Sequence, residues 1–236
     1  MQKGLFGSKP RSSKKSDKQL LAQRKNRQPA VMTTYISGDN LRDSVARAKT
    51  MSRRIFGPVL DKLELVTEEG IWLRYLQAIL KNGVCALDTE TDGLDSIHDE
   101  LVGVCLYTPG QKSIYVPINH VSNMTKVRLK GQVSVESMKL FIQSLVDNDI
   151  DIIYHNAKFD MKSIYWRLGI KVNEPAWDTF LASMLLNENE PHSLKLLHAK
   201  YVKEEADADV AKFNDLFKGI PFSLIPLDVA FMYAAY

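Results

Sequence analysis

Three short runs of aliphatic, β-branched and aromatic residues follow one another in the middle of the chain, and they constrain the fold more than any other feature. The runs cover Val84–Asp88, Leu101–Tyr107 and Ser113–Pro117. Turn-forming residues separate them, among them Pro109-Gly110. Short β-rich runs with turn residues between them predict consecutive antiparallel strands.

Helical patterns surround these three runs. A helix is expected to end at Asn82-Gly83, just before the first of them. After them, a buried strand from Asp151 to His155 is expected between a helix near Val135–Val146 and a helix over Lys158–Leu168. Further helices are expected over residues 179–186, 193–201 and 227–236. Strands first, followed by alternating strand and helix, predict an α/β protein with a mixed sheet flanked by helices.

The composition excludes two classes of protein. Of the 236 residues, 45% are hydrophobic, which is ordinary for a globular chain. No apolar stretch reaches the roughly 18 residues of a membrane helix, and the basic N-terminus lacks the apolar segment of a secretory signal. Cys85 and Cys105 lie on separate apolar runs and are expected to be buried reduced thiols. We therefore expect a cytoplasmic protein with no membrane partner.

The charge is divided unevenly along the chain. Residues 1–60 hold 14 Lys/Arg and 3 Asp/Glu, whereas residues 61–236 hold 17 Lys/Arg and 25 Asp/Glu. A basic N-terminal extension is therefore attached to an acidic globular domain. This arrangement is common in proteins that handle nucleic acid.

The basic extension itself divides into two parts. Residues 1–30 are rich in Lys, Arg, Ser and Gln and are expected to be disordered. Residues 40–56 show helical spacing of apolar residues among basic ones, so an amphipathic helix is expected there. Two interpretations of this helix are open. It is either a basic helix exposed to solvent, or a helix that rests on a phosphate backbone or on a partner domain. The domain boundaries expected are 1–60 for the extension and 61–236 for the globular domain.

Three acids occupy every second position where the first strand ends, namely Asp88, Glu90 and Asp92. Residues two apart in a strand point to the same face, so Asp88 and Glu90 can aim at one point beyond the strand. Carboxylate oxygens suit Mg²⁺ or Mn²⁺, and a cation would remove the repulsion between the acids. The pair alone is a weak signal, because such acids are also common on solvated loops.

Two more segments carry candidate site residues. Asp160 falls in the first turn of the helix after the buried strand, where an acid also gains from the helix dipole. Asp178 is expected to cap the helix that follows it. Tyr233, on the last helix, is either a core residue or a phenol that faces a water molecule in the site.

Taken together, these segments resemble a known family. "DTETDGL" (Asp88 to Leu94), "NAKFD" (Asn156 to Asp160) and "YAAY" (Tyr233 to Tyr236) are similar, in this order, to the three exonuclease motifs of the DEDD superfamily in its tyrosine-bearing form. The similarity is greatest to the proofreading domain of family A, bacterial polymerase I type, DNA polymerases. It covers about residues 63–236 and leaves out the basic extension.

The resemblance implies a ribonuclease-H-like fold and the 3′-to-5′ hydrolysis of the terminal phosphodiester of a DNA strand. It implies two divalent cations, Mg²⁺ or Mn²⁺. Asp88 would bridge them, Glu90 would bind the first, and Asp160 would support the second, largely through water. Tyr233 would orient the attacking water. Two ions can activate that water and stabilise the leaving oxygen.

The resemblance also implies a substrate and a partner. Thr91, Leu94 and Asn156 match the family positions that hold the 3′-terminal nucleotide, so the partner would be the 3′ end of single-stranded DNA. Leu94 offers an apolar surface on which an unpaired base can stack. A further partner would be the remaining polymerase segment.

The chain departs from the family pattern at its end. The family motif is Y-x-x-x-D, and from Tyr233 the acid would fall one residue after Tyr236, where the chain ends. We therefore expect a C-terminally truncated exonuclease domain that binds the first metal weakly and cleaves poorly. Equal rates with and without an added aspartate after Tyr236 would contradict this.

Two other readings stay open. A stand-alone exoribonuclease of the ribonuclease D type has the same motifs, and a comparison of DNA with RNA oligonucleotides would separate it. The other is a non-catalytic module that binds single strands. Metal titration with Asp88→Ala as control would test for it.

Overall fold

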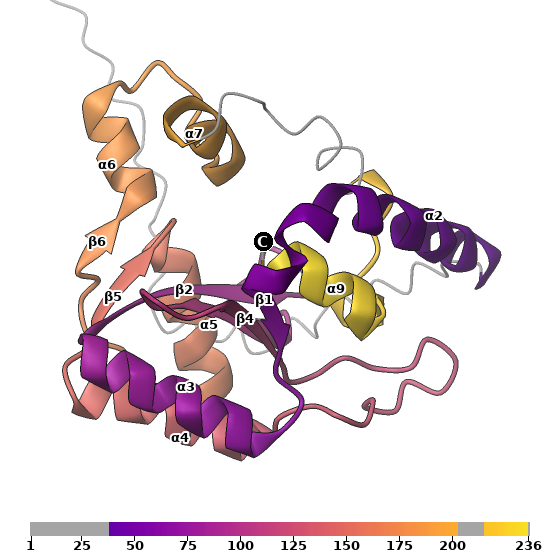
Figure 1. Cartoon of the computed structure of the whole chain (residues 1–236), viewed down its shortest axis with the longest axis horizontal. Helices are drawn as coiled ribbons and strands as arrows, with labels where there is room; N and C mark the ends of the chain where they lie inside the picture. The colour runs from indigo at the N-terminus through magenta and orange to yellow at the C-terminus, as the bar shows by residue number, and fades with distance from the viewer. Residues whose placement is uncertain (1–37, 203–214, 236) are drawn as a thin grey trace, which may run out of the picture. The chain divides into compact units, whose positions relative to one another are not determined.

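The computed structural model describes residues 38–202 and 215–235 of the chain. The disorder expected for residues 1–30 lies outside this range, as does the last residue of the expected terminal helix. The described residues belong to one compact unit that begins at Ile36. Figure 1 shows it as a sheet with helices on both sides.

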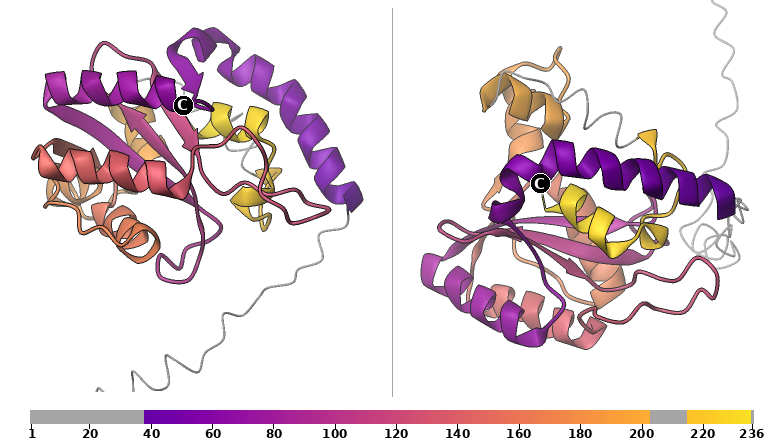
Figure 2. Two further views of the ribbon diagram at one scale, coloured as in Figure 1. Left: turned by 90° about the horizontal axis from the view of Figure 1, so that it is seen from below. Right: turned by 45° about the vertical axis from the view of Figure 1, so that its right-hand side comes forward.

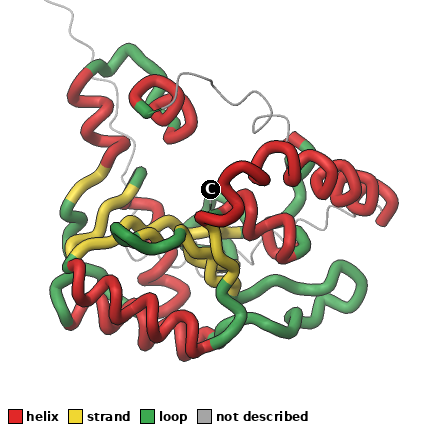
Figure 3. The backbone as a smooth tube through the Cα atoms, viewed as in Figure 1, coloured by secondary structure: helices red, strands yellow, loops and turns green. Residues whose placement is uncertain are grey.

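A single mixed sheet of six strands organises this unit, in the order β1-β4-β3-β2-β5-β6. Its strands are drawn in yellow in Figure 3. β2 is antiparallel to β3, and β3 is antiparallel to β4, whereas the pairs β1–β4, β2–β5 and β5–β6 are parallel. The strands are β1 (Leu63–Leu65), β2 (Val84–Thr91), β3 (Leu101–Tyr107), β4 (Ser113–Pro117), β5 (Asp151–Tyr154) and β6 (Trp177–Asp178). The predicted antiparallel set and the α/β mixed sheet are confirmed.

The strand predictions differ from the structure in three respects. β5 ends at Tyr154, one residue before the predicted end at His155. β2 continues to Thr91 rather than ending at Asp88, because its acids pair with β3 in register. β1 and β6 were not predicted, since segments of three and two residues are too short to show a period.

The helices end within one residue of their predicted ends, except the last, which ends at Ala234 instead of continuing through Ala235. They are α2 (Gly38–Phe56), α3 (Glu69–Asn82), α4 (Val135–Asp147), α5 (Ala157–Leu168), α6 (Thr179–Leu186), α7 (Leu194–Tyr201) and α9 (Leu227–Ala234), with 3₁₀ helices η1 (Gly57–Lys62) and η2 (Phe222–Leu224). Gly83 ends α3 and Gly169 ends α5, both with positive φ, a conformation that glycine adopts without a steric penalty. Ser134 caps α4, because its side chain accepts a hydrogen bond from the Ser137 N–H.

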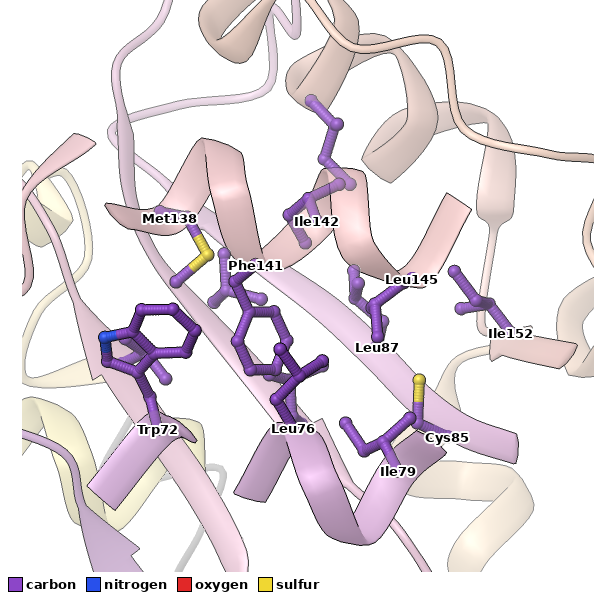
Figure 4. Packing of buried hydrophobic residues seen from close by; sticks show 14 of the residues in the cluster. Trp72, Leu76, Ile79, Cys85, Leu87, Met138, Phe141, Ile142, Leu145 and Ile152 are labelled. Atoms are coloured by element: carbon purple, nitrogen blue, oxygen red, sulfur yellow. The ribbon is translucent and has the colours of Figure 1, made fainter. Parts of the chain in front are cut away.

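The larger core lies between one face of the sheet and the helices α3, α4 and α5 (Figure 4). Trp72 of α3 and Phe141 of α4 meet edge to face, with ring centroids 5.5 Å apart. Ile79, Leu145 and Leu87 are almost completely buried beside them. Burial of these side chains supplies most of the driving force for folding. Leu87 of β2 faces this core, so its neighbours Asp88 and Ala86 face the other side of the sheet.

The opposite face of the sheet is covered by α9 and α2, which lie side by side in both views of Figure 2. Ala48 and Phe56 of α2 are fully buried in a second core with Val229 and Ala230 of α9. Lys49 of α2 also forms an ion pair with an acid of α9, at 2.9 Å. The helix expected near residues 40–56 is therefore amphipathic, and its apolar side packs on the same unit as the sheet. Its basic side chains lie on the remaining, exposed side.

A buried polar chain connects this second core to the start of α9. The Tyr115 hydroxyl lies 2.6 Å from Nε2 of His120, and Nδ1 of His120 lies 2.9 Å from the Ile225 carbonyl oxygen. Because a carbonyl can only accept, Nδ1 carries the hydrogen and Nε2 accepts from Tyr115. Burial lowers the pKa of His120 to about 4, so the ring is neutral at physiological pH. These two hydrogen bonds connect β4 to the residues just before α9 and so hold this helix against the sheet.

No helix in residues 38–202 or 215–235 is long and apolar enough to span a membrane. Both cysteines are buried and free, as predicted.

Candidate active site

The acids Asp88 and Glu90 of β2 converge with Cys105 of β3 on the face of the sheet that α9 covers. One ligand atom from each of the three lies within 4.8 Å of the others. The strand register explains this, since Asp88 pairs directly with Cys105 and residues opposite each other share a face. Within the part of the chain that the structure describes, this is the one cluster of its kind. The predicted convergence of Asp88 and Glu90 is thus present in the structure.

Asp160 approaches the same acids from α5, on the other side of the sheet. One of its carboxylate oxygens, Oδ1, accepts hydrogen bonds from the Thr89 N–H at 2.9 Å and from the Thr89 hydroxyl at 2.7 Å. Asp160 is therefore tied to the strand between Asp88 and Glu90, although it lies outside the 4.8 Å cluster. Because Oδ1 is used by Thr89, Oδ2 is the oxygen with more freedom to face a cation.

The three carboxyl groups hold protons more tightly than isolated acids do. Burial raises the pKa of Asp88 to about 6, although its side chain is open to solvent on one side. Burial, and then the charge of Asp88, raise the pKa of Glu90 to about 8 and that of Asp160 to about 8. Thr89 opposes the shift at Asp160 through its hydrogen bonds. Crowded carboxylates of this kind favour a cation as their partner.

A divalent cation fits this donor set. The oxygens of Asp88, Glu90 and Asp160 are hard ligands of the type that Mg²⁺ and Mn²⁺ prefer. Cys105 adds a sulfur that is buried, and burial together with the nearby acids raises the pKa of its thiol. The protonated thiol is a poor metal ligand, so the oxygens are the groups that fit the ion.

Tyr233 of α9 extends toward the carboxylates. Burial, followed by the charges of Glu90 and Asp88, raises the pKa of its phenol well above the usual range, so the hydroxyl keeps its proton. Its ring lies 6.2 Å from that of Phe222. The Lys195 ammonium on α7 donates a hydrogen bond to the Tyr233 hydroxyl at 3.4 Å.

A cavity of about 280 Å³ opens beside Tyr233. Thr91, Asp92, Phe217 and Phe222 contribute to its wall. Aromatic walls next to polar groups suit a nucleobase with its sugar. Of the predicted nucleotide-binding residues, Thr91 lines this cavity and its hydroxyl donates to the Gly93 carbonyl at 2.6 Å.

The other two predicted nucleotide-binding residues lie on the surface. Leu94 is 93% exposed, which leaves an apolar side chain available to a ligand. Asn156 is exposed at the start of α5 with a left-handed backbone, φ 73°. Neither of them lines the cavity beside Tyr233.

The third acid of the alternating run, Asp92, forms hydrogen bonds to a residue outside the cluster. The Asp92 carboxylate accepts from the Ser223 N–H at 2.7 Å and from the Ser223 hydroxyl at 2.9 Å. Asp92 is thus tied to η2 and does not join the cluster of Asp88 and Glu90. The alternation alone could not distinguish it from the other two acids, because its partner lies far along the chain.

Asp178 accepts backbone hydrogen bonds at the starts of two helices, α5 and α6. It accepts from the Phe180 and Leu181 N–H groups, which confirms the predicted cap of α6. It also accepts from the Asn156 and Ala157 N–H groups, both at 2.9 Å, and so holds the turn that leads into α5. Partial burial alone would raise the pKa of Asp178, but these four bonds lower it.

We expect Asp178→Ala to lower the free energy of unfolding by about 2–3 kcal/mol, because a helix cap and charge-assisted hydrogen bonds are lost together. Urea denaturation followed by circular dichroism measures the change. Asp178→Asn keeps one acceptor oxygen and should lose less. Wild-type stability in Asp178→Ala would show that the four bonds contribute nothing.

Two residues near the acids were not predicted, Lys195 and Cys105. Neither carries a local signal, since each reaches the site only through the packing of α7 and the β2–β3 register. His155, which follows β5, takes part in a hydrogen bond, because its Nδ1 lies 2.9 Å from the Thr179 hydroxyl oxygen.

Comparison with known sequences covers nearly all of the globular unit. The sequence model of a family described as 3′-5′ exonuclease matches residues 63–235. DNA polymerase I of Borreliella burgdorferi is 28% identical over 153 residues, which are 63% of this chain and 16% of that polymerase. The DNA polymerase of Escherichia phage T5 is 27% identical over 214 residues, 84% of this chain and 23% of that polymerase. The chain therefore spans less than a quarter of the length of either polymerase.

Comparison with solved structures finds a similar fold in an RNase. The structure of Trypanosoma brucei RNase D in complex with GMP has a TM-score of 0.50 and 14% identity, and the match covers 73% of this chain and 54% of that one. At this identity the likeness concerns the fold, and it supports the predicted ribonuclease-H-like architecture.

Proposed function

The chain belongs to the 3′-5′ exonuclease family of family A DNA polymerases, and from this membership we propose that it removes nucleotides from the 3′ end of single-stranded DNA. The family activity is metal-dependent hydrolysis. The observation that carries the proposal furthest is the convergence of Asp88 and Glu90, with Asp160 tied between them through Thr89. The choice of DNA, of a single strand and of its 3′ terminus rests on the resemblance of the motifs.

We propose that Asp88, Glu90 and Asp160 hold two divalent cations, Mg²⁺ or Mn²⁺. When bound, such ions lower the pKa of water and neutralise charge on a phosphate. The charge of Asp88 raises the pKa of both other acids, so Asp88 is suited to serve both ions. Glu90 belongs to the tight cluster with Asp88, whereas Asp160 has one oxygen already engaged by Thr89.

Tyr233 is proposed to orient the attacking water. Its hydroxyl stays protonated, because burial and the nearby acids hold its pKa high. It therefore acts as a hydrogen-bonding group rather than as a base. The Phe222 ring beside it, and the cavity that both residues line, would take the terminal base and sugar.

Thr91, Leu94 and Asn156 are proposed to bind the 3′-terminal nucleotide. Thr91 lies on the cavity wall. Leu94 is exposed and apolar, so a base can stack on it. Asn156 sits at the turn that Asp178 holds, next to the first turn of α5 that carries Asp160.

The matched polymerases are much longer than this chain. We propose that the exonuclease unit works with a polymerase segment, in the cytoplasm, and removes misincorporated nucleotides. The basic face of α2 and the basic residues before it are proposed to contact phosphates of the nucleic acid, which predicts affinity that falls steeply with salt.

The test uses a single-stranded DNA oligonucleotide labelled at its 5′ end, with Mg²⁺ or Mn²⁺. We expect a ladder that shortens one nucleotide at a time from the 3′ end, with mononucleotides as product. Chelation of the metal with EDTA should abolish the ladder, because the ions that activate water and offset the charge of the acids and the phosphate are then removed.

The same oligonucleotide made of RNA separates the competing functions. Faster shortening of RNA would assign the ribonuclease D type of activity instead. Metal-independent binding with no shortening of either strand would overturn the proposal in favour of a passive single-strand-binding module. A strand blocked by a 3′-phosphorothioate linkage, which resists hydrolysis, is the substrate control.

A further inference from the structure

Lys195 is a cationic side chain that contacts Tyr233 of the candidate active site from outside the three motifs. It occupies the second position of α7, a helix that stands on the same side of the sheet as α9 in Figures 1 and 2. Its Nζ lies 3.4 Å from the Tyr233 hydroxyl oxygen and 4.7 Å from the centroid of the Tyr233 ring. An ammonium over an aromatic face is attracted by the ring quadrupole. Lys195 therefore binds Tyr233 in two ways at once.

The charge of Lys195 also acts on the carboxylates. Burial and the charge of Asp88 raise the pKa of Glu90, and the charge of Lys195 opposes that rise. Reciprocally, partial burial lowers the pKa of Lys195 while Glu90 raises it. Among the lysines and arginines that the structure describes, Lys195 is the one whose charge acts on Glu90 in this way. The ammonium thus contacts the phenol of Tyr233, and its charge acts on Glu90.

The contact with Tyr233 places the Lys195 ammonium beside the acids, where its charge and that of a metal ion would oppose each other. A divalent cation on Glu90 and the ammonium would repel each other, because both are positive and both act on the same carboxylate. The Tyr233 ring, in contrast, keeps its favourable contact with Lys195 whether or not the metal is bound.

We propose that Lys195 is a positioning residue with two effects: it orients the Tyr233 hydroxyl, and its ammonium, held at Tyr233 beside the acids, is a counter-charge that opposes the binding of a divalent ion. This inference rests on the proposed exonuclease function for its first effect. The second effect concerns metal binding alone and stands independently of catalysis.

The arrangement has an internal control in the same helix. Lys200 of α7 lies over the ring of Tyr201, 5.0 Å from its centroid, and pairs with Glu190. This lysine, tyrosine and glutamate form a group of the same composition on the exposed surface, and none of the three is in the cluster of Asp88 and Glu90. Lys200→Met therefore removes the same charge from the same helix.

The first experiment measures metal affinity. Lys195→Met keeps an unbranched apolar side chain of similar length and removes the charge. We expect it to bind Mn²⁺ roughly three- to tenfold more tightly than the wild type, in calorimetric titration or by electron paramagnetic resonance, because the competing ammonium is gone. Lys195→Arg and Lys200→Met should stay near the wild-type value. Weaker or unchanged Mn²⁺ binding by Lys195→Met would overturn the counter-charge role.

The second experiment measures turnover at saturating metal and DNA. Lys195→Met is expected to lower kcat about tenfold with a smaller change in KM, and Lys195→Arg should restore most of it. If Lys195 acts through Tyr233, the double variant Lys195→Met/Tyr233→Phe should be no slower than Tyr233→Phe alone. Additive losses would overturn the positioning role. If the wild type had no nuclease activity, the proposed function would be wrong. The Mn²⁺ titration would then still test the effect of the Lys195 charge on metal binding.

Discussion

Replacing Asp88 with asparagine is expected to reduce nuclease activity by roughly a thousandfold or more, the scale associated with loss of a group that stabilises transition-state charge. Asparagine has nearly the same shape as aspartate but lacks the negative charge. Asp88 clusters with Glu90 and Cys105, and its charge also raises the pKa of Asp160. The substitution therefore removes the carboxylate that is proposed to bind both ions. Release of mononucleotides from single-stranded DNA, and Mn²⁺ titration by calorimetry, measure the two consequences.

The stability of Asp88→Asn should move in the opposite direction. Burial raises the pKa of Asp88 to about 6, so the ionised form is less favourable in the folded metal-free chain than in the unfolded chain. Above that pH, the charge on Asp88 lowers the free energy of unfolding. Asparagine removes this effect, and since Asp88 is open to solvent on one side, we expect a gain of at most about 1 kcal/mol.

The pairing of lost activity with unchanged or higher stability distinguishes a functional acid from a structural one. Asp147→Asn is the matched control, because Asp147 is an exposed acid at the end of α4, on the other side of the sheet. It should keep both activity and metal binding. Lower stability of Asp88→Asn in the presence of EDTA, or full Mn²⁺ binding by it, would contradict the proposed role of Asp88.

Replacing Gly103 with alanine is expected to destabilise the chain by about 3–5 kcal/mol. Gly103 lies on β3 opposite Glu90, and a Cβ there would come closer than 3.0 Å to the ring and hydroxyl of Tyr115. Tyr115 cannot move away freely, because it is fully buried and its hydroxyl donates to His120. The overpacking and the broken hydrogen bond therefore add to each other.

The effect should extend to the site. His120 in turn donates to the Ile225 carbonyl just before α9, so a displaced Tyr115 loosens the helix that carries Tyr233. Thermal and urea denaturation measure the loss, which is a large part of the 5–15 kcal/mol by which domains are stable.

Gly70→Ala is the control for this substitution. Gly70 lies in the first turn of α3, where an added Cβ meets no atom within 4 Å. Alanine is favoured over glycine in a helix by up to about 1 kcal/mol, so Gly70→Ala should be as stable as the wild type or slightly more. Gly103→Ala with wild-type stability would show that Tyr115 can rearrange without penalty.

The parts of the fold that sequence reasoning recovered are those with a long local pattern. The helices α3, α4 and α5 each bury an apolar stripe and end at turn residues such as Gly83 and Gly169. The strands β2, β3 and β4 are long enough to show β-rich composition. β1 and β6 were missed because two or three residues hold no period.

The candidate site divides in the same way. The alternation of Asp88 and Glu90 within one strand is visible in the sequence, because the side-chain period of a strand is two. The same alternation includes Asp92, which the structure assigns to Ser223 instead. Local spacing thus identifies which acids can share a face, but not which of them have a competing partner far along the chain.

The sequence by itself determined the class of fold, the three motif segments and the residue types that can hold a cation, since these depend on periodicity and side-chain chemistry over a few neighbouring residues. Only the tertiary structure decided that Asp160 is fastened to Thr89, that Cys105 completes the cluster with Asp88 and Glu90, and that Lys195 reaches Tyr233. These contacts depend on the β2–β3 register and on the placement of α5, α7 and α9 around the sheet. Packing of the whole unit sets those arrangements, and no short stretch of sequence encodes them.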